Sequence, residues 1–430
     1  MDQTSLFRSL PRDLQYLITN YNPRLIFIQP KSELIKYDWF QLIKMNFSLT
    51  YERDSSTNEE IMKVYLDHCK KSKPRIICGY NHTIIRLKDG KVSGCGDNSW
   101  GQLGLGKIPR CVFQELKGIE KKVLEIACGN EHTIIRLADG TLMGSGDNFY
   151  GQLGVGDNHF RYSFAKIIQK PISKVICGAY HTIIKLIDGT LMASGDNSYG
   201  EMGLGDYVSR NTFTEMNKLP TPISEVICGG FHTMVILTDG TLMSCGYNRE
   251  GQLGLGDNVN RCVFTEIKSK KNIAKVTCGN RHTIIRLTDG TLLSCGYNDK
   301  GQLGLGDYLN RNVPIIINCP KNTDEVICGL DHTILKLTNG KLMSCGQNYY
   351  GQLGIQDYKA RCIFYEINLS KKVKSVACGG SYTIVSLTNG TLMGCGDNSK
   401  GQLSLGRTTL NKIDRFLEIQ KYSKTSCVIS

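Results

Sequence analysis

Several short stretches of this sequence combine residue types that perform chemistry in enzymes. From His282 to Tyr308 the chain carries a His-Thr pair, an Asp-Gly, a Cys-Gly and the run GQLGLG. Histidine can act as a general base, cysteine as a nucleophile, and a glycine-rich loop as a cradle for phosphate. These residues form either an active site or part of a framework, and their recurrence along the chain decides between the two.

The stretch recurs seven times. The glycine run starts at Gly101, Gly151, Gly200, Gly251, Gly301, Gly351 and Gly401. A Cys-Gly pair that is followed, after two further residues, by His-Thr has its cysteine at positions 78, 128, 177, 228, 278, 328 and 378. Both markers advance by 49 to 51 residues per step. A fixed period of this length is the signature of a repeat architecture.

The repeated histidine argues against catalysis, because a catalytic histidine would be needed only once. Six units carry it, and the seventh has Tyr382 instead. The six are His82, His132, His181, His232, His282 and His332. We expect each imidazole to lie between neighbouring units and to satisfy buried backbone polar groups. Equivalent positions around a ring lie too far apart to bind one ion, so we predict no metal site.

The other reactive types also indicate a framework. The second Cys-Gly cysteine is Cys95, Cys245, Cys295, Cys345 or Cys395, but Ser145 and Ser194 replace it in two units. That position therefore requires a small side chain and not a nucleophile. The run GQLGLG lacks the Lys-Ser/Thr of a P-loop, and we expect its leucines to pack between units. We predict no catalytic residue and no cofactor.

Each unit reads as four strands. In the unit that contains His282, residues 274–279, 282–287, 292–296 and 313–317 are rich in β-branched residues, and an Asp-Gly turn separates the second and third segments. No helical periodicity interrupts them. Seven such units predict an all-β fold, a seven-bladed β-propeller of four-stranded blades. The expected blades are 74–123, 124–172, 173–223, 224–273, 274–323, 324–373 and 374–420, followed by a tail at 421–430.

A propeller must join its last blade to its first. We predict that the seventh fourth strand, Arg415 to Ile419, crosses to the first blade and pairs near residues 75–78. The alternative is seven self-contained blades.

The units resemble the repeat of the regulator of chromosome condensation family, which reads Cys-Gly, His-Thr, Asp-Gly, Gly-x-Asn and GQLG. The Gly-x-Asn appears here, for example, as Gly96-Asp97-Asn98 and Gly246-Tyr247-Asn248. The match covers all seven units and implies a seven-bladed propeller. The family includes the exchange factor for the small GTPase Ran, propeller portions of ubiquitin ligases, and scaffolds. The Ran exchange factor carries an inserted wedge, and the near-constant unit length here argues against one.

Residues 1–73 have a different, helical character. Apolar residues follow Leu-Pro at helical spacing, and residues 33–47, which include Trp39, predict a second helix, with a third at 58–71. The segment resembles an F-box, a degenerate motif. That resemblance implies binding to a Skp-type adaptor through Leu10, Pro11, Leu14 and Ile18. The alternative is a small helical cap packed on the propeller.

Composition bounds the setting. The chain has 430 residues, a formal net charge of +13 and 18 cysteines without a C-x-x-C pair. It contains no apolar run of membrane-spanning length and no secretory signal, so we expect an intracellular protein, cytoplasmic or nuclear, with thiols kept reduced. We expect a monomer that binds no membrane.

Three functions stay open. The first is a non-enzymatic protein–protein interaction scaffold, as a substrate receptor of a cullin-type ubiquitin ligase through the F-box-like segment. The second is a guanine-nucleotide exchange factor for a Ran-like small GTPase, and the third is a chromatin or nucleic-acid binder, which the charge motivates. Residues just before the histidines vary on a constant frame, as binding residues do; the alternative is unconstrained drift of loop residues. The candidate face residues are Tyr80, Asn81, Asn130, Glu131, Tyr180, Phe231, Arg281 and Asp331.

Overall fold

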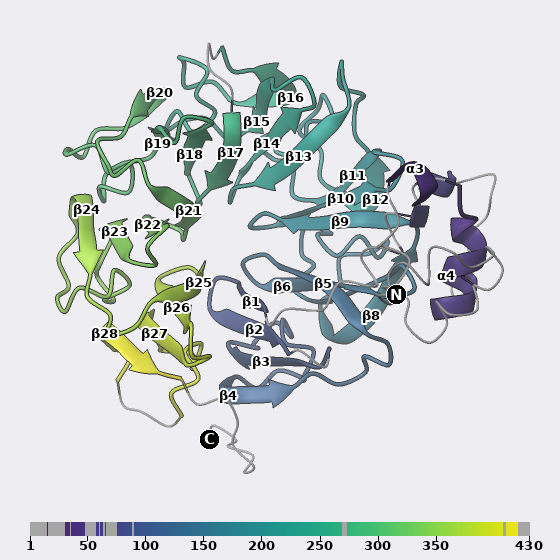
Figure 1. Cartoon of the computed structure of the whole chain (residues 1–430), viewed down its shortest axis with the longest axis horizontal. Helices are drawn as coiled ribbons and strands as arrows, with labels where there is room; N and C mark the ends of the chain where they lie inside the picture. Colours follow the sequence, from purple (N-terminus) through teal and green to yellow (C-terminus); the bar gives the residue numbers. More distant parts are fainter. Residues whose placement is uncertain are drawn as a thin grey trace, which may run out of the picture.

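Each 50-residue unit folds into one antiparallel sheet, and seven sheets stand around a central axis (Figure 1). The computed structural model describes residues 15, 31–34, 36–47, 57–59, 61, 62, 65, 75–87, 90–268, 273–406 and 410–419. Within every blade the strands pair in sequence order, so that the first strand lies nearest the axis and the fourth forms the outer rim. The predicted seven-bladed propeller is confirmed.

The strand bounds repeat from blade to blade. The first two blades contain β1 (Arg75–Cys78), β2 (His82–Arg86), β3 (Val92–Gly96), β4 (Arg110–Glu115), β5 (Val123–Cys128), β6 (His132–Leu137), β7 (Thr141–Gly146) and β8 (Arg161–Gln169). The third and fourth contain β9 (Ile172–Cys177), β10 (His181–Leu186), β11 (Leu191–Gly195), β12 (Arg210–Glu215), β13 (Ile223–Cys228), β14 (His232–Leu237), β15 (Leu242–Gly246) and β16 (Arg261–Glu266).

The remaining three blades follow the same order. They contain β17 (Ile273–Cys278), β18 (His282–Leu287), β19 (Leu292–Gly296), β20 (Arg311–Ile316), β21 (Thr323–Cys328), β22 (His332–Leu337), β23 (Leu342–Gly346), β24 (Arg361–Ile367), β25 (Val373–Cys378), β26 (Tyr382–Leu387), β27 (Leu392–Asp397) and β28 (Lys412–Glu418).

The second strand of each blade is buried along nearly its whole length, because both of its faces pack against neighbouring blades. Its β-branched sequence, His-Thr-Ile-Ile in β18, suits that environment. The turn to the third strand has a glycine at positive φ, for example 80° at Gly140, which the Asp-Gly hairpin requires. These turns form one face of the ring, called here the hairpin face. The loops from first to second and from third to fourth strand form the opposite side, called the loop face.

Apolar side chains fill the seams between blades. One cluster joins Val92 and Leu103 of the first blade to Ile126 and Ile135 of the second. Leu103, like its counterparts Leu153, Leu253, Leu303, Leu353 and Leu403, is completely buried. The prediction that the leucines of the glycine run pack between blades is confirmed.

The predicted strand exchange at ring closure is wrong. β28 pairs with β27 inside its own blade, so all seven blades are self-contained (Figure 1). The last seam is built from the contacts that every other seam uses. Gly406 N donates to Cys111 O at 3.3 Å, as Gly106 N donates to Tyr162 O at 2.9 Å in the first seam. A repeated seam of this kind closes the ring without any strand crossing it.

A ring of seven backbone hydrogen bonds also closes around the axis. The residue after each Cys-Gly donates its amide to the carbonyl at or beside the same position in the next blade, with N···O distances of 2.9 to 3.2 Å. The donors are Tyr80, Asn130, Ala179, Gly230, Asn280, Leu330 and Gly380. Gly380 N completes the circle on Tyr80 O, so the last blade is hydrogen-bonded directly to the first.

Among the described residues of the N-terminal segment, the helices α3 (Lys31–Leu34) and α4 (Trp39–Phe47) lie beside the third blade (Figure 1). The predicted single helix over 33–47 is therefore divided, with Trp39 at the start of α4. Trp39 is fully buried and packs edge-on against Tyr65, with ring centroids 5.1 Å apart. Ile187 of the third blade packs against the same cluster. Leu10, Pro11, Leu14 and Ile18 lie outside the described residues, as does most of the predicted third helix.

No helix among the described residues combines the length and apolar character that crossing a bilayer requires.

Candidate interaction face

The repeated histidines join neighbouring blades. His82 Nε2 lies 3.1 Å from Thr133 Oγ1 of the next blade, and His282 Nε2 lies 3.0 Å from Thr333 Oγ1. Every threonine hydroxyl in this ring donates to a backbone carbonyl, as Thr133 does to Gln102 O at 2.7 Å. The imidazole must therefore donate its Nε2 proton to the threonine oxygen. The expected place between blades is confirmed, although the partner is a side-chain hydroxyl and not the backbone.

Burial keeps these imidazoles neutral. It lowers the pKa of His82 and His181 to about 4, and that of His282 and His332 to about 3. A histidine that stays uncharged across the physiological range, with its Nε2 proton committed to a threonine, does not act as a proton shuttle. The six rings are structural.

The second set of cysteines plays an equally structural part. Cys245 Sγ lies 3.6 Å from Glu201 O of the preceding blade, and Ser145 Oγ lies 3.5 Å from the equivalent Gln102 O. A thiol and a hydroxyl thus make the same hydrogen bond at the same place in the seam, which explains why the two residue types alternate there.

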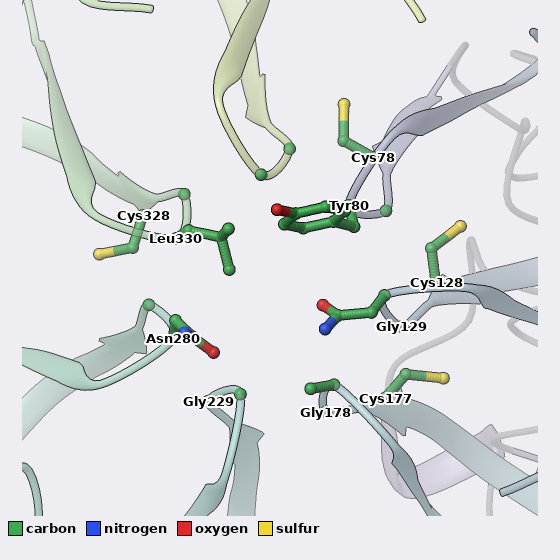
Figure 2. A pocket seen from close by; sticks show the side chains of 18 of the residues that line it. Cys78, Tyr80, Cys128, Gly129, Cys177, Gly178, Gly229, Asn280, Cys328 and Leu330 are labelled. Carbon is green, nitrogen blue, oxygen red and sulfur yellow. The ribbon is translucent and has the colours of Figure 1, made fainter. Parts of the chain in front are cut away.

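The Cys-Gly cysteines surround the central opening without facing it. This opening has a volume of about 140 Å³ and is lined by the Cys-Gly-x triplets of all seven blades. Figure 2 shows the thiols of Cys78, Cys128, Cys177 and Cys328 turned away from the centre, while Tyr80, Asn280 and Leu330 point toward it. Burial raises the pKa of Cys78, Cys228 and Cys328 to about 12, so these groups are thiols and not thiolates at neutral pH.

Within the described ranges, no three His, Cys, Asp or Glu side chains are grouped so that they could hold a metal ion.

The eight candidate face residues form two concentric rings on the loop face. Tyr80 and Asn130 line the central opening. The other six lie one step outward. The backbone carbonyl of each accepts a hydrogen bond from the residue that follows the third strand of the same blade. These six are Asn81, Glu131, Tyr180, Phe231, Arg281 and Asp331. Asp147 N donates to Glu131 O at 2.8 Å, and Tyr247 N to Phe231 O at 2.9 Å. The variable positions thus adjoin the Gly-x-Asn loops.

Five aromatic rings from three adjacent blades meet on this face. Tyr180 lies between Tyr150 and Phe231, at centroid distances of 5.5 and 6.0 Å. Tyr199 lies 6.0 Å from Phe231 and 4.8 Å from Tyr247. All five are partly exposed. This set, Tyr150, Tyr180, Tyr199, Phe231 and Tyr247, is called the aromatic arc.

Sequence reasoning found only Tyr180 and Phe231 of the arc. Tyr150 and Tyr199 precede the glycine run, and Tyr247 is the variable residue of Gly-x-Asn. A signal was available, since these positions also vary among the units, but which of them meet depends on how neighbouring blades are juxtaposed.

Charged groups flank the aromatic arc on both sides. On the second blade, burial raises the pKa of Glu131 to about 7, and nearby Asp147 and Asp97 raise it further. On the fifth blade, the Arg281 guanidinium lies over the Tyr297 ring, 4.1 Å from its centroid, and 3.6 Å from Glu250 Oε1. The arc therefore lies between the carboxyl groups of the second blade and the ion pair of Arg281 with Glu250 on the fifth. Aromatic and arginine side chains together are enriched in protein-binding surfaces.

Solved structures that resemble this chain share the ring architecture. Yeast RCC1 (Prp20) bound to Kap60 matches with a TM-score of 0.71 and 18% identity over 83% of this chain and 86% of that one. Prp20p from Saccharomyces cerevisiae, in a structure described together with its binding to Gsp1p and histones, matches with a TM-score of 0.70 and 19% identity over 83% and 89%. Human WBSCR16 matches with a TM-score of 0.66 and 21% identity over 74% and 88%.

Family models match along most of the chain. The RCC1-like domain matches residues 51–335, and models of the regulator of chromosome condensation (RCC1) repeat match residues 339–386 and 373–402. The repeat unit, the seven blades and these matches agree, and the chain belongs to the RCC1-like propeller family.

Proposed function

We propose that this propeller is a non-enzymatic protein-interaction module that binds its partner through the loop face, with the aromatic arc at the centre of the contact. The observation that carries the proposal is the arc itself, five partly exposed aromatic rings in contact with one another across three adjacent blades. Aromatic and arginine side chains dominate the binding energy of protein interfaces, and rigid aromatic rings lose little entropy on binding.

The buried chemistry supports the same conclusion. The histidines and cysteines are used within and between blades, with pKa values that keep them neutral. The face residues instead vary on a frame whose hydrogen bonds are the same in every blade. A rigid frame with variable, solvent-facing side chains suits recognition of another protein.

The test compares arc variants with a rim control. Photo-crosslinking through a benzophenone side chain at position 199 identifies the partner, and Phe231→Ser and Tyr247→Ser are then measured against it. Each should weaken binding at least about tenfold, the loss typical of a central interface residue. Tyr358→Ser, an exposed tyrosine outside the arc, should leave affinity unchanged. Full affinity of both arc variants would contradict the proposal.

The identity of the partner separates the finer functions. A small GTPase whose nucleotide release accelerates with micromolar protein would assign exchange activity. Histones or DNA, bound with an affinity that falls steeply with salt, would assign chromatin binding. Any other protein client leaves the scaffold role.

A substrate-receptor role further requires the N-terminal segment to bind a Skp-type adaptor. The support is the spacing of Leu10, Pro11, Leu14 and Ile18 in the sequence. Co-purification of the adaptor with the full chain, lost on Leu14→Asp and retained by the arc variants, is the expected result. An intact chain that binds no adaptor would rule this role out.

A further inference from the structure

Six of the seven seams are closed at the outer rim by a phenylalanine. It comes from the fourth strand of one blade and packs on the fourth residue of the glycine run of the blade before it. A methyl group on Gly104 would lie 2.5 Å from the ring of Phe164, and one on Gly304 would lie 2.4 Å from that of Phe364. The six phenylalanines are Phe113, Phe164, Phe213, Phe264, Phe364 and Phe416.

The fifth blade lacks this ring. Pro314 of β20 occupies the equivalent position, and a methyl group on Gly254 would lie 3.3 Å from the nearest proline atom. The apolar cluster of this seam contains no aromatic residue. A hollow of about 570 Å³ opens here between the fourth and fifth blades, and Leu255, Ile285, Leu293 and Pro314 are among the residues that line it.

A second departure lies on the same strand. In each of the six other blades, the fourth-strand residue that pairs with the third-strand residue equivalent to Leu293 is charged. These residues are Glu115, Lys166, Glu215, Glu266, Glu366 and Glu418. In the fifth blade it is Ile316, which pairs with the hollow-lining Leu293 and is 60% exposed. Ile315 and Val313 beside it are also exposed.

The two departures point to one use. A missing ring leaves room that an incoming side chain can fill, and an isoleucine in place of a charge removes the desolvation cost of covering the strand. An exposed apolar surface beside a concave apolar site is the pattern of an anchor site.

We propose that the hollow between the fourth and fifth blades is a docking site for a protein segment that inserts one aromatic side chain, while its flanking residues cover Ile316. The occupant is aromatic because the chain itself fills the same space with phenylalanine in its six other seams. Glu266 and Lys268 at the mouth suit polar residues on either side of the inserted ring. This rim site is separate from the loop face, and it stands or falls independently of the function proposed there.

The test uses a pair of capped heptapeptides with a central 4-fluorophenylalanine or alanine flanked by serine and glycine. Binding of the fluorinated peptide to the full chain is followed by ¹⁹F line broadening, and the alanine peptide serves as a competitor. Pro314→Phe, which restores the ring of the other seams, should weaken binding at least about tenfold and raise Tm. Ile316→Glu should weaken it more modestly, and Ile363→Ser, an exposed residue on the sixth blade, should not change it.

A second variant covers the case in which Pro314→Phe does not fold. Thr265→Tyr narrows the mouth of the hollow, and the sixth blade carries Tyr365 at the equivalent position, so this change suits the strand. Weaker binding by this variant supports the site. The proposal would be overturned if the fluorinated peptide bound wild type, Pro314→Phe and Thr265→Tyr equally well. It would also be overturned if the alanine peptide competed as strongly as an unlabelled aromatic peptide. Wild-type self-association that Pro314→Phe abolishes, seen by light scattering, would assign the hollow to a second copy and overturn it too.

Discussion

Tyr382 Oη lies 3.0 Å from Thr83 Oγ1, although the two residues are separated by nearly 300 positions in the sequence. The phenol donates its one proton to His82 O at 2.6 Å, and the Thr83 hydroxyl donates to Gln402 O at 2.8 Å. Tyr382 stands where the six other blades have histidine, but its hydrogen bond to the next blade ends on a backbone carbonyl and not on the threonine. The last blade is thus joined to the first by a link of a different kind from the other six.

Tyr382→Phe removes that link, so we expect it to destabilise the propeller by about 1–2 kcal/mol, because the buried His82 carbonyl loses one of its two donors and keeps only Gly79 N. Tyr382→His should recover most of the loss, since histidine forms the six other links. Thermal unfolding measures both. A phenylalanine variant as stable as wild type would show that the link contributes nothing to closure.

Gly279→Ala tests the seam between the fifth and sixth blades. A methyl group there would lie 2.1 Å from His282 Cε1 and 2.7 Å from Gly329 O. Since both groups are held in a close-packed interface, we expect a loss of about 2–4 kcal/mol. The midpoint of urea unfolding gives the value, and Ser399→Ala at an exposed position is the control. A loss equal to that of the control would contradict the packing described here.

Glu201 gives the propeller a pH dependence. It replaces the buried glutamine of the other six units, and burial, with a further contribution from Asp196, raises its pKa from 4.5 to about 8. The folded state therefore holds this proton more tightly than the unfolded state, and wild type loses stability as the pH rises from 4.5 to 8. Glu201→Gln lacks the loss, so its advantage in Tm should grow over that range.

At pH 8 the free energy of unfolding of Glu201→Gln should exceed that of wild type by at least about 1.4 kcal/mol, which corresponds to a shift of one pKa unit. Thermal unfolding at pH 5 and pH 8 provides the comparison. A difference between the two proteins that is the same at both pH values would contradict the raised pKa.

Cys245→Ser tests the interchange of thiol and hydroxyl in the seam. Ser145 and Ser194 make the same hydrogen bond with backbone carbonyls of the preceding blade, each at 3.5 Å. We expect a cost below about 1 kcal/mol for serine, and a larger cost for Cys245→Val, which loses the donor and adds volume. Chemical unfolding ranks the two. A serine variant less stable than the valine variant would contradict this account.

The core of the fold follows from local patterns that the sequence displays. The period of about 50 residues, the β-branched second strands and the Asp-Gly turns are each set by neighbouring residues, and each of them appears in the structure. The division of the predicted 33–47 helix at Lys36–Asp38 could not be read in this way, because Trp39 is positioned by its contact with the distant Tyr65.

The candidate site was predicted only in outline. The variable positions before the histidines lie on one face, as their equivalent places in the units imply. Their grouping into an arc depends on two contacts between blades. Tyr150 of the second blade contacts Tyr180 of the third, and Tyr199 of the third blade contacts Tyr247 of the fourth. Such contacts are set by the angle between blades, which no single unit encodes.

The sequence by itself determined the number of blades, the strands within each and the structural use of the repeated histidines and cysteines, because repetition and backbone preference are local properties of the chain. Only the tertiary structure decided that the ring closes through Gly380 and Tyr382 without an exchanged strand. It also decided that five aromatic residues meet on one face and that Pro314 leaves a hollow at one seam. These features arise between residues from different blades, and only closure of the ring brings those residues together.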